Sequence, residues 1–369
     1  MTRKGWLAEF ATSAKGTDRF SDNDDHAALL AVGLMGEAGS ILSELKKEKR
    51  EREAYPAYRR KMEEEIGDFL WYFVRLVSVL DQALLNELEV ASGPDLQQEG
   101  SRSLSVFLDL GHAVGEVLAG VKKSVSAAEV RPMLRRVWGA LHAVARQAQI
   151  VLQDAAIGNT RKIESRWPED RIYSALFDEG FPEEEQLPRN LEVEFRERTR
   201  GEQKVVILRC NSINFGDWIT DNILDPDGYR YHDVFHFSHA VHLGWSPVVR
   251  ALLRCKRKSS ERIDEAEDGA RAVILEEAIA AIVFSRAKQL KFFEGLNHVD
   301  YDLLKTVQEF IDGYEVETVP LWQWEEAILD GYRAFRQLRE NQGGRVRLDI
   351  REHRISYTPH CVPSARALQ

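Results

Sequence analysis

The segment "EEEIGDFLWYF", residues 63–73, joins four acidic residues to the start of an aromatic and aliphatic run. On a helix, Glu65 and Asp68 are three residues apart and share a face. An earlier segment, "GLMGEAGSILSEL", supplies Glu37 and, seven residues later, Glu44 on the same face. Two antiparallel helices that each present carboxylates beside an apolar seam can hold Mg²⁺ or Mn²⁺. The alternative, that each acid lies on a solvated helix face, stays open.

A basic group lies in the segment "NTRKIESR". Asn159, Lys162 and Arg166 are three and four residues apart, so they share one face of a helix. An amide, an ammonium and a guanidinium on one face suit the oxygens of a polyphosphate. An ordinary basic helix end, beside the negative pole of the helix dipole, is the alternative.

A third group lies in "GYRYHDVFHFSHAVHLGW", where three histidines recur at i, i+4 and i+7. A later segment, "DEAEDGARAVILEEAIAAIVF", offers acids for a facing helix. Histidines that face carboxylates suit Zn²⁺, Mn²⁺ or Fe. The alternatives are imidazoles that hydrogen-bond buried acids, or a surface for an effector or partner. The candidate second site comprises His232, Asp233, His236, His239, Glu267, Asp268, Glu276 and Glu277.

The elements that must position these groups change character along the chain. Residues 25–166 place apolar residues at helical spacing and read as successive helices. The stretch 166–190 is rich in acids and prolines, which is typical of a linker. Residues 191–210 alternate around Gly201 and predict a β-hairpin, and 343–359 alternate again. Helices are expected between these two stretches.

We therefore predict a mainly α fold. An all-α helical bundle is expected in residues 1–168, a linker in 169–189, and an α+β domain with a small antiparallel sheet in 190–369. A net charge of −10 argues against non-specific binding to nucleic acid, and no sequence-specific nucleic-acid partner is expected. Three cysteines without a CxxC motif, Cys210, Cys255 and Cys361, favour a reducing compartment. Without an evident signal peptide or membrane-spanning window, the protein is expected in the cytoplasm and away from membranes.

Residues 25–168 resemble the MazG family of all-α nucleoside triphosphate pyrophosphohydrolases. The family signature is EExxE, then ExxD, and later NxxKxxxR. "EEIGD" matches the second element and "NTRKIESR" the third. The first element departs from the pattern, because Gly36 and Ser40 stand where the family has acids and only Glu37 is kept. We hypothesise that Glu44, one helical turn after Ser40, takes over the role of a metal ligand. The histidine-rich part resembles the C-terminal domain that accompanies some MazG-like proteins.

The helices between the second and third motifs look like a worn copy of the first two. "LGHAVGEVLAGVKK" echoes "LMGEAGSILSELKK", and "VWGAL" echoes "EIGDF". The copies lack complementary residues: Ala113 and Ala140 stand for Glu37 and Asp68, while Glu89 and Gly93 stand for Lys162 and Arg166. We therefore hypothesise a fused pseudo-dimer with one working site. The competing view is that any two amphipathic helix pairs look alike.

The resemblance implies Mg²⁺-dependent hydrolysis, with Mn²⁺ as a substitute, of an NTP or dNTP to the monophosphate and pyrophosphate. It implies catalytic and metal-binding roles for Glu37, Glu65 and Asp68, with Glu44 as a further ligand, and substrate-binding roles for Asn159, Lys162 and Arg166. Two alternatives remain: a nucleotide-sensing protein with a degenerate site, or a metal-dependent phosphohydrolase acting through the histidine-rich domain. The preferred base, homo-oligomer formation, and a housekeeping or phage-defence role are left open.

Overall fold

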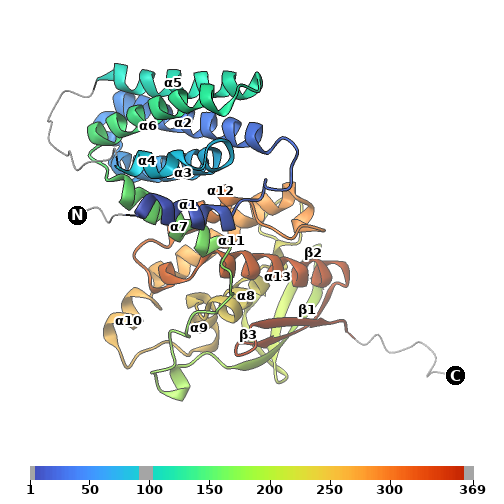
Figure 1. Cartoon of the computed structure of the whole chain (residues 1–369). Helices are drawn as coiled ribbons and strands as arrows, with labels where there is room; N and C mark the ends of the chain where they lie inside the picture. Colours follow the sequence, from blue (N-terminus) through green and yellow to red (C-terminus); the bar gives the residue numbers. More distant parts are fainter. Residues whose placement is uncertain (1–4, 91–102, 361–369) are drawn as a thin grey trace. The chain divides into compact units, whose positions relative to one another are not determined.

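The computed structural model describes residues 5–90 and 103–360 of the chain. Cys361 and Gly93, named above, lie outside this range. The chain divides into two compact units, Met1–Glu169 and Asp170–Gln369 (Figure 1). In the described residues the first unit is helical and the second combines helices with one antiparallel sheet. The predicted fold class, mainly α with a C-terminal α+β part, is confirmed.

The first unit is built from two long helical hairpins and the helices that flank them. α2 packs on α3, α5 packs on α6, and α2 also packs on α5. After the second hairpin the chain crosses over, so that α7 packs on α3, whereas α4 contacts α1, α3 and α6. The duplication stays a hypothesis. The elements are α1 Trp6–Gly16, α2 His26–Glu51, η1 Arg52–Ala54, α3 Tyr58–Leu80, α4 Leu84–Val90, α5 Leu104–Lys122, α6 Ala127–Ala148 and α7 Leu152–Arg166.

A buried carboxylate fixes the start of α2 against α3. Asp18, in the loop before α2, accepts hydrogen bonds from the Phe20 backbone N–H at 2.8 Å and from Arg75 Nε of α3 at 2.9 Å. His26 Nε2, at the first residue of α2, lies 2.8 Å from the same side chain. Burial alone would raise the pKa of Asp18, but these three partners lower it. The two helices are therefore held in one register by an ionised group.

Two segments of the first unit are long and apolar enough to cross a membrane by length and composition alone, His26–Ala54 and Leu104–Lys122. This corrects the expectation that the chain has no such window. In their most apolar windows, 39% and 33% of the residues are buried inside the unit. Because core helices pass the same test, these segments are weak evidence for a membrane span.

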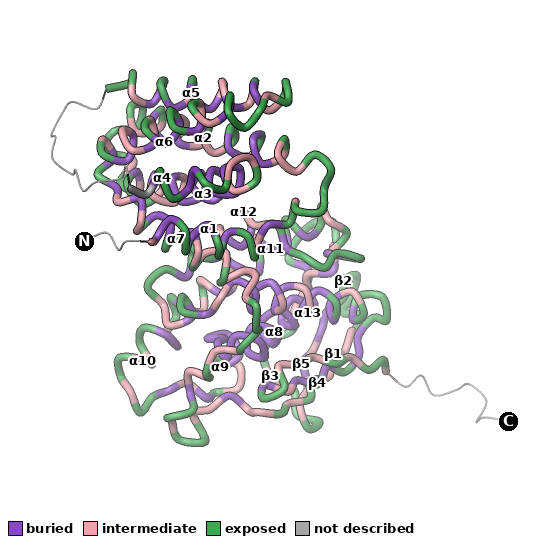
Figure 2. The backbone as a smooth tube through the Cα atoms, in the orientation of Figure 1, coloured by how far each residue is buried: buried purple, intermediate pink, exposed green. Residues whose placement is uncertain are grey.

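The second unit packs helices on a sheet of strand order β3-β2-β1-β4-β5. β1 and β2 form the predicted hairpin, with Arg200 paired to Gln203 around Gly201, and β4 and β5 extend the sheet as expected. α8 packs against α13 and the sheet and is buried along its whole length (Figure 2). The elements are η2 Glu183–Glu185, β1 Asn190–Arg200, β2 Gln203–Cys210, β3 Ile213–Ile219, η3 Tyr229–Tyr231, α8 Asp233–Leu243, α9 Pro247–Leu253, α10 Glu261–Ala266, α11 Ala270–Gln289, η4 Lys291–Phe293, α12 Tyr301–Phe310, η5 Glu315–Thr318, α13 Leu321–Glu340, β4 Gly343–Asp349 and β5 Arg354–Thr358.

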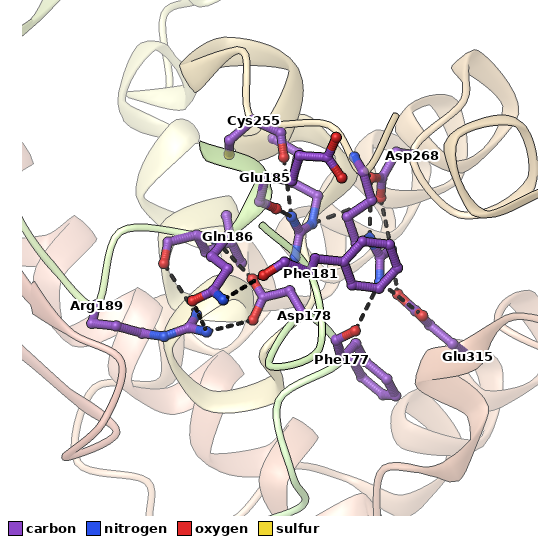
Figure 3. A network of polar contacts seen from close by, with 12 residues as sticks. Phe177, Asp178, Phe181, Glu185, Gln186, Arg189, Cys255, Asp268 and Glu315 are labelled. Carbon is purple, nitrogen blue, oxygen red and sulfur yellow. Dashed lines mark hydrogen bonds and ion pairs between the residues drawn. The ribbon is translucent and has the colours of Figure 1, made fainter. Parts of the chain in front are cut away.

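The segment 169–189, expected as a linker, packs on the second unit from Asp170 onward. Its Asp178 is fully buried and accepts hydrogen bonds from Arg189 Nη2 and Arg250 Nη2, each at 2.7 Å, and from the Leu187 N–H at 2.8 Å (Figure 3). Burial alone would raise the pKa of Asp178, and these donors lower it. Buried ion pairs of this kind fix the segment to α9.

Candidate functional site

Three carboxylates from α2 and α3 meet at the surface of the first unit. One oxygen from each of Glu37, Glu65 and Asp68 lies within 4.8 Å of the others, and all three residues are half-buried. We call this group the acidic cluster. Its oxygens are close enough to share one hard cation. The structure thus brings together three of the four predicted metal ligands.

Buried neighbours hold these acids at the rim of the helical core. In α2, Leu34 and Ala38 are buried on either side of Glu37. In α3, Ile66 and Phe69 are fully buried and stand next to the other two acids in sequence. Because the apolar stripe of each helix faces inward, the adjoining carboxylates emerge where the two stripes meet.

Two glycines allow the helices to approach closely at this point. A Cβ on Gly67 would lie 2.7 Å from the backbone oxygen of Ala155 and 3.1 Å from Cβ of Asn159, so a larger residue would push α7 away. A Cβ on Gly33 would lie 2.1 Å from the ring of Tyr72, so α2 carries no side chain where this ring packs. The acidic cluster therefore depends on small residues as well as on its acids.

α7 brings two of the predicted substrate-binding residues to the cluster. Asn159 Nδ2 donates to Asp68 Oδ1 at 2.6 Å, and Lys162 Nζ donates to the same oxygen. Lys162 Nζ also lies 4.0 Å from Glu64 Oε1. The amide and the ammonium therefore converge on the acids although about 90 residues separate them in sequence.

The electrostatics of the cluster show an excess of negative charge. Burial, reinforced by the charges of Asp68 and Glu65, raises the pKa of Glu37 to about 7, and Lys162 offsets only part of this. Burial also raises the pKa of Asp68, against the opposing effect of Lys162. One ammonium does not balance three carboxylates. A divalent cation would relieve the repulsion, so the donor set fits Mg²⁺ or Mn²⁺.

Glu44 and Arg166 are not part of this group. Glu44 is buried and accepts hydrogen bonds from Tyr55 Oη and Lys47 Nζ. Burial alone would raise its pKa, but these two donors lower it. Glu44 does not join the other three carboxylates within ligand distance, which corrects the prediction that it is a fourth ligand. Arg166 ends α7 with its guanidinium carbon 4.5 Å from the centre of the Trp167 ring, a cation–π contact.

Sequence reasoning missed Tyr72 at this site. Tyr72 follows Asp68 by one helical turn and is half-buried, and its pKa is raised by burial and by the charges of Glu37 and Asp68. The four-residue spacing was a usable signal, because such residues share a helix face. Tyr55, which donates to Glu44, was also not predicted. It lies in the turn between α2 and α3, so no helical spacing marks it.

The second unit gathers histidines and carboxylates in its interior. His236 is fully buried, with Nδ1 3.0 Å from Glu276 Oε1 and Nε2 3.4 Å from Glu277 Oε2. His232 Nε2 lies 3.6 Å from both Asp233 Oδ1 and Glu277 Oε2. We call these residues, together with His239, the histidine cluster. Six of the eight predicted members of the second site are thus brought together.

Glu276 anchors the histidine cluster to α9. It accepts hydrogen bonds from Ser246 Oγ at 2.9 Å and from the Val248 N–H at 3.0 Å, and it lies 2.9 Å from His239 Nδ1. Burial alone would raise the pKa of Glu276, but His236 and His239 lower it to about 2. Burial alone would lower the pKa of His236, whereas its carboxylate neighbours raise it to about 10.

Glu267 and Asp268 lie elsewhere, which corrects their assignment to this site. α11 begins at Ala270, so the helical spacing assumed between Asp268 and the later glutamates does not hold. Asp268 accepts from Arg257 N and Arg257 Nη2, each at 2.7 Å (Figure 3). Glu267 accepts from the Glu315 backbone N–H at 3.2 Å. Both acids stabilise a structural network.

Comparison with protein families gives a match in the second unit. A family model described as the MazG C-terminal domain matches residues 172–361, which include the histidine cluster and the sheet. Neither the curated proteins nor the solved structures include one that matches the chain.

Proposed function

The chain belongs to the MazG C-terminal domain family, whose model covers more than half of it, and from this premise we propose that it is a Mg²⁺-dependent nucleoside triphosphate pyrophosphohydrolase. The reaction would convert an NTP or dNTP and water to the monophosphate and pyrophosphate. The family match lies in the second unit, so the proposed chemistry is argued from the first unit's own residues.

The observation that carries the proposal is the convergence of α7 on the acidic cluster. Asn159 and Lys162 both donate to Asp68, next to Glu37 and Glu65. An all-oxygen donor set beside an ammonium and an amide is what a metal-bound polyphosphate needs. These residues come from the three sequence elements that resemble the MazG signature.

The roles of the residues follow from their chemistry. Glu37, Glu65 and Asp68 would hold Mg²⁺, which when bound supplies charge neutralisation and lowers the pKa of a ligand water. Lys162 would exchange its contact with Asp68 for the leaving pyrophosphate oxygens, where its charge is needed most. Asn159 would keep Asp68 oriented through its 2.6 Å hydrogen bond. Most of the rate would then come from positioning and charge stabilisation.

Two observations favour a second candidate, a nucleotide-binding protein that does not turn its ligand over. Gly36 and Ser40 stand where the MazG signature has acids, and Asp68 Oδ1 is already engaged by Asn159 and Lys162. A cluster of three acids can bind a metal–nucleotide complex without placing a second ion for catalysis.

The deciding experiment is a Mg²⁺-supplemented panel of NTPs and dNTPs, with monophosphate, pyrophosphate and orthophosphate resolved, on the wild type and Asp68→Ala. Glu116→Ala is the matched control, because Glu116 is a partly exposed acid on α5 that pairs with Arg136. Monophosphate and pyrophosphate that disappear only in Asp68→Ala would support the enzyme. Nucleotide binding without product would favour the sensor, and a product unaffected by Asp68→Ala would assign the chemistry to the second unit.

A further inference from the structure

The spacing of the donor atoms in the histidine cluster is unusual for hydrogen bonds. His232 Nε2 is 3.6 Å from Asp233 Oδ1 and 3.6 Å from Glu277 Oε2, and His236 Nε2 is 3.4 Å from Glu277 Oε2. Hydrogen bonds between such atoms are normally 2.7–3.2 Å long. Two ligands each about 2.0–2.1 Å from a tetrahedral ion are roughly 3.3 Å apart. The separations therefore resemble those between ligands of one ion.

The outer nitrogens of the two histidines face partners that suit metal ligands. His232 Nδ1 lies 3.0 Å from the Tyr229 carbonyl oxygen, so its N–H can donate there and leave the Nε2 lone pair toward the cluster. The Tyr229 ring stacks on His232 with centroids 4.4 Å apart and fixes its plane. His236 Nδ1 faces Glu276 Oε1 at 3.0 Å. Metal-binding histidines typically have a carbonyl or carboxylate at the second nitrogen.

A purely hydrogen-bonded histidine cluster accounts less well for these contacts. His236 is fully buried, yet among the described residues neither of its ring nitrogens makes a hydrogen bond of acceptable geometry. Buried polar atoms without such partners are uncommon and costly. The neighbouring His239 and Glu276, by contrast, satisfy each other and Ser246. Of these two nitrogens, Nε2 lies toward the proposed ligands, 3.4 Å from Glu277 Oε2, whereas Nδ1 faces Glu276.

We propose that the second unit binds one divalent transition-metal ion through His232 Nε2, His236 Nε2, Asp233 Oδ1 and Glu277 Oε2. Glu276 is a positioning residue that orients His236. Two imidazoles with two carboxylates suit Zn²⁺, Fe²⁺ or Mn²⁺, whereas Mg²⁺ prefers the all-oxygen acidic cluster. The Glu277 side chain is 41% exposed, so the ion can enter from that side.

The test measures metal binding by the full chain without using its activity. Co²⁺ is titrated into the apoprotein in excess Mg²⁺, which occupies all-oxygen sites, and visible absorption and metal content after gel filtration are recorded. The wild type is expected to bind about one Co²⁺ per chain with nitrogen-ligand absorption bands, and Zn²⁺ is expected to displace it. Glu277→Gln and His232→Gln should each weaken binding at least about tenfold.

His242→Gln is the matched control, because His242 lies on the same buried helix but pairs with Asp330 at 3.1 Å. Glu277→Gln is isosteric and partly exposed, so it tests the ligand without a large packing change. Stoichiometric binding that survives in His242→Gln and is lost in the two ligand variants supports the site. The absence of stoichiometric binding in the wild type, or equal binding by all variants, would overturn it. Mg²⁺-dependent turnover of nucleotides reports separately on the acidic cluster.

Discussion

The acidic cluster and the histidine cluster differ in how the charges within each are balanced. In the acidic cluster, carboxylates repel one another and the pKa of Glu37 rises to about 7 through burial and the charges of its neighbours. In the histidine cluster, although burial opposes ionisation, imidazoles and carboxylates support one another, and the pKa of Glu276 falls to about 2. In the acidic cluster, the repulsion between carboxylates lowers stability until a cation relieves it. In the histidine cluster, the ion pairs between imidazoles and carboxylates already stabilise the folded state.

The largest expected effect is the loss of stability when Glu276 of the histidine cluster is replaced. Glu276→Ala leaves Ser246, the Val248 N–H and His239 without their buried acceptor. Losing one partner of a buried charged network costs about 3–5 kcal/mol. Urea unfolding at pH 7, followed by circular dichroism, should report this loss in the transition of the second unit.

Glu277→Gln, compared with Glu276→Ala in the metal-free protein, is the control, because the Glu277 side chain is 41% exposed and its replacement should change the unfolding free energy far less. If Glu276→Ala unfolds at the same urea concentration as the wild type, Glu276 does not anchor the core.

The next effect concerns the cation of the acidic cluster. Lys162→Met keeps the length of the side chain but removes the only ammonium that donates to Asp68 among the described residues. We expect kcat to fall about 10²-fold, because charge stabilisation of the leaving group is lost. Steady-state kinetics with Mg²⁺ and the best nucleotide of the panel measures this. Arg161→Met, the exposed neighbour on α7, should retain activity, and equal losses in both variants would contradict a specific role for Lys162.

The next prediction compares two glycines that match each other in the proposed repeat of the first unit. Gly67 faces Ala155 O, whereas Gly139, its counterpart in the proposed repeat, has open space where a Cβ would stand. Gly67→Ala should cost about 1–3 kcal/mol through overpacking and lower activity by displacing α7. Gly139→Ala should be neutral or stabilise the helix by up to about 1 kcal/mol. Thermal unfolding of both variants tests this, and equal effects would show that the α3–α7 contact is loose.

Helical spacing allowed much of the candidate site to be predicted from sequence. It grouped Glu65 with Asp68 and Asn159 with Lys162, because periodicity fixes which residues share a face. It failed for Glu44, which Tyr55 captures from the turn after α2. It failed for Asp268, since the spacing was extended across the start of α11. Partners that depend on where a helix begins or on a turn are set by tertiary packing, and periodicity within one segment does not report them.

The last prediction tests the repulsion between Glu37 and the other carboxylates of the acidic cluster. The pKa of Glu37 is about 7 in the folded protein and near 4.5 when unfolded. Between these values the folded state binds a proton that the unfolded state has lost, so stability falls as pH rises from about 4.5 to 7 and stays reduced above it. The full pKa shift corresponds to about 3.4 kcal/mol, which solvent screening at this half-buried site reduces. Glu37→Gln should therefore stabilise the metal-free protein by roughly 2 kcal/mol at pH 8, and by much less at pH 5.

Urea titrations at both pH values, without divalent ions, measure the gain, and Glu116→Gln at the partly exposed acid of α5 is the control. Saturating Mg²⁺ should abolish the advantage of Glu37→Gln, because the cation relieves the same repulsion in the wild type and binds only the form with ionised acids. A gain that is equal at pH 5 and pH 8 would assign the stabilisation to packing. A gain that Mg²⁺ leaves unchanged would separate Glu37 from the metal site while keeping it among the repelling carboxylates.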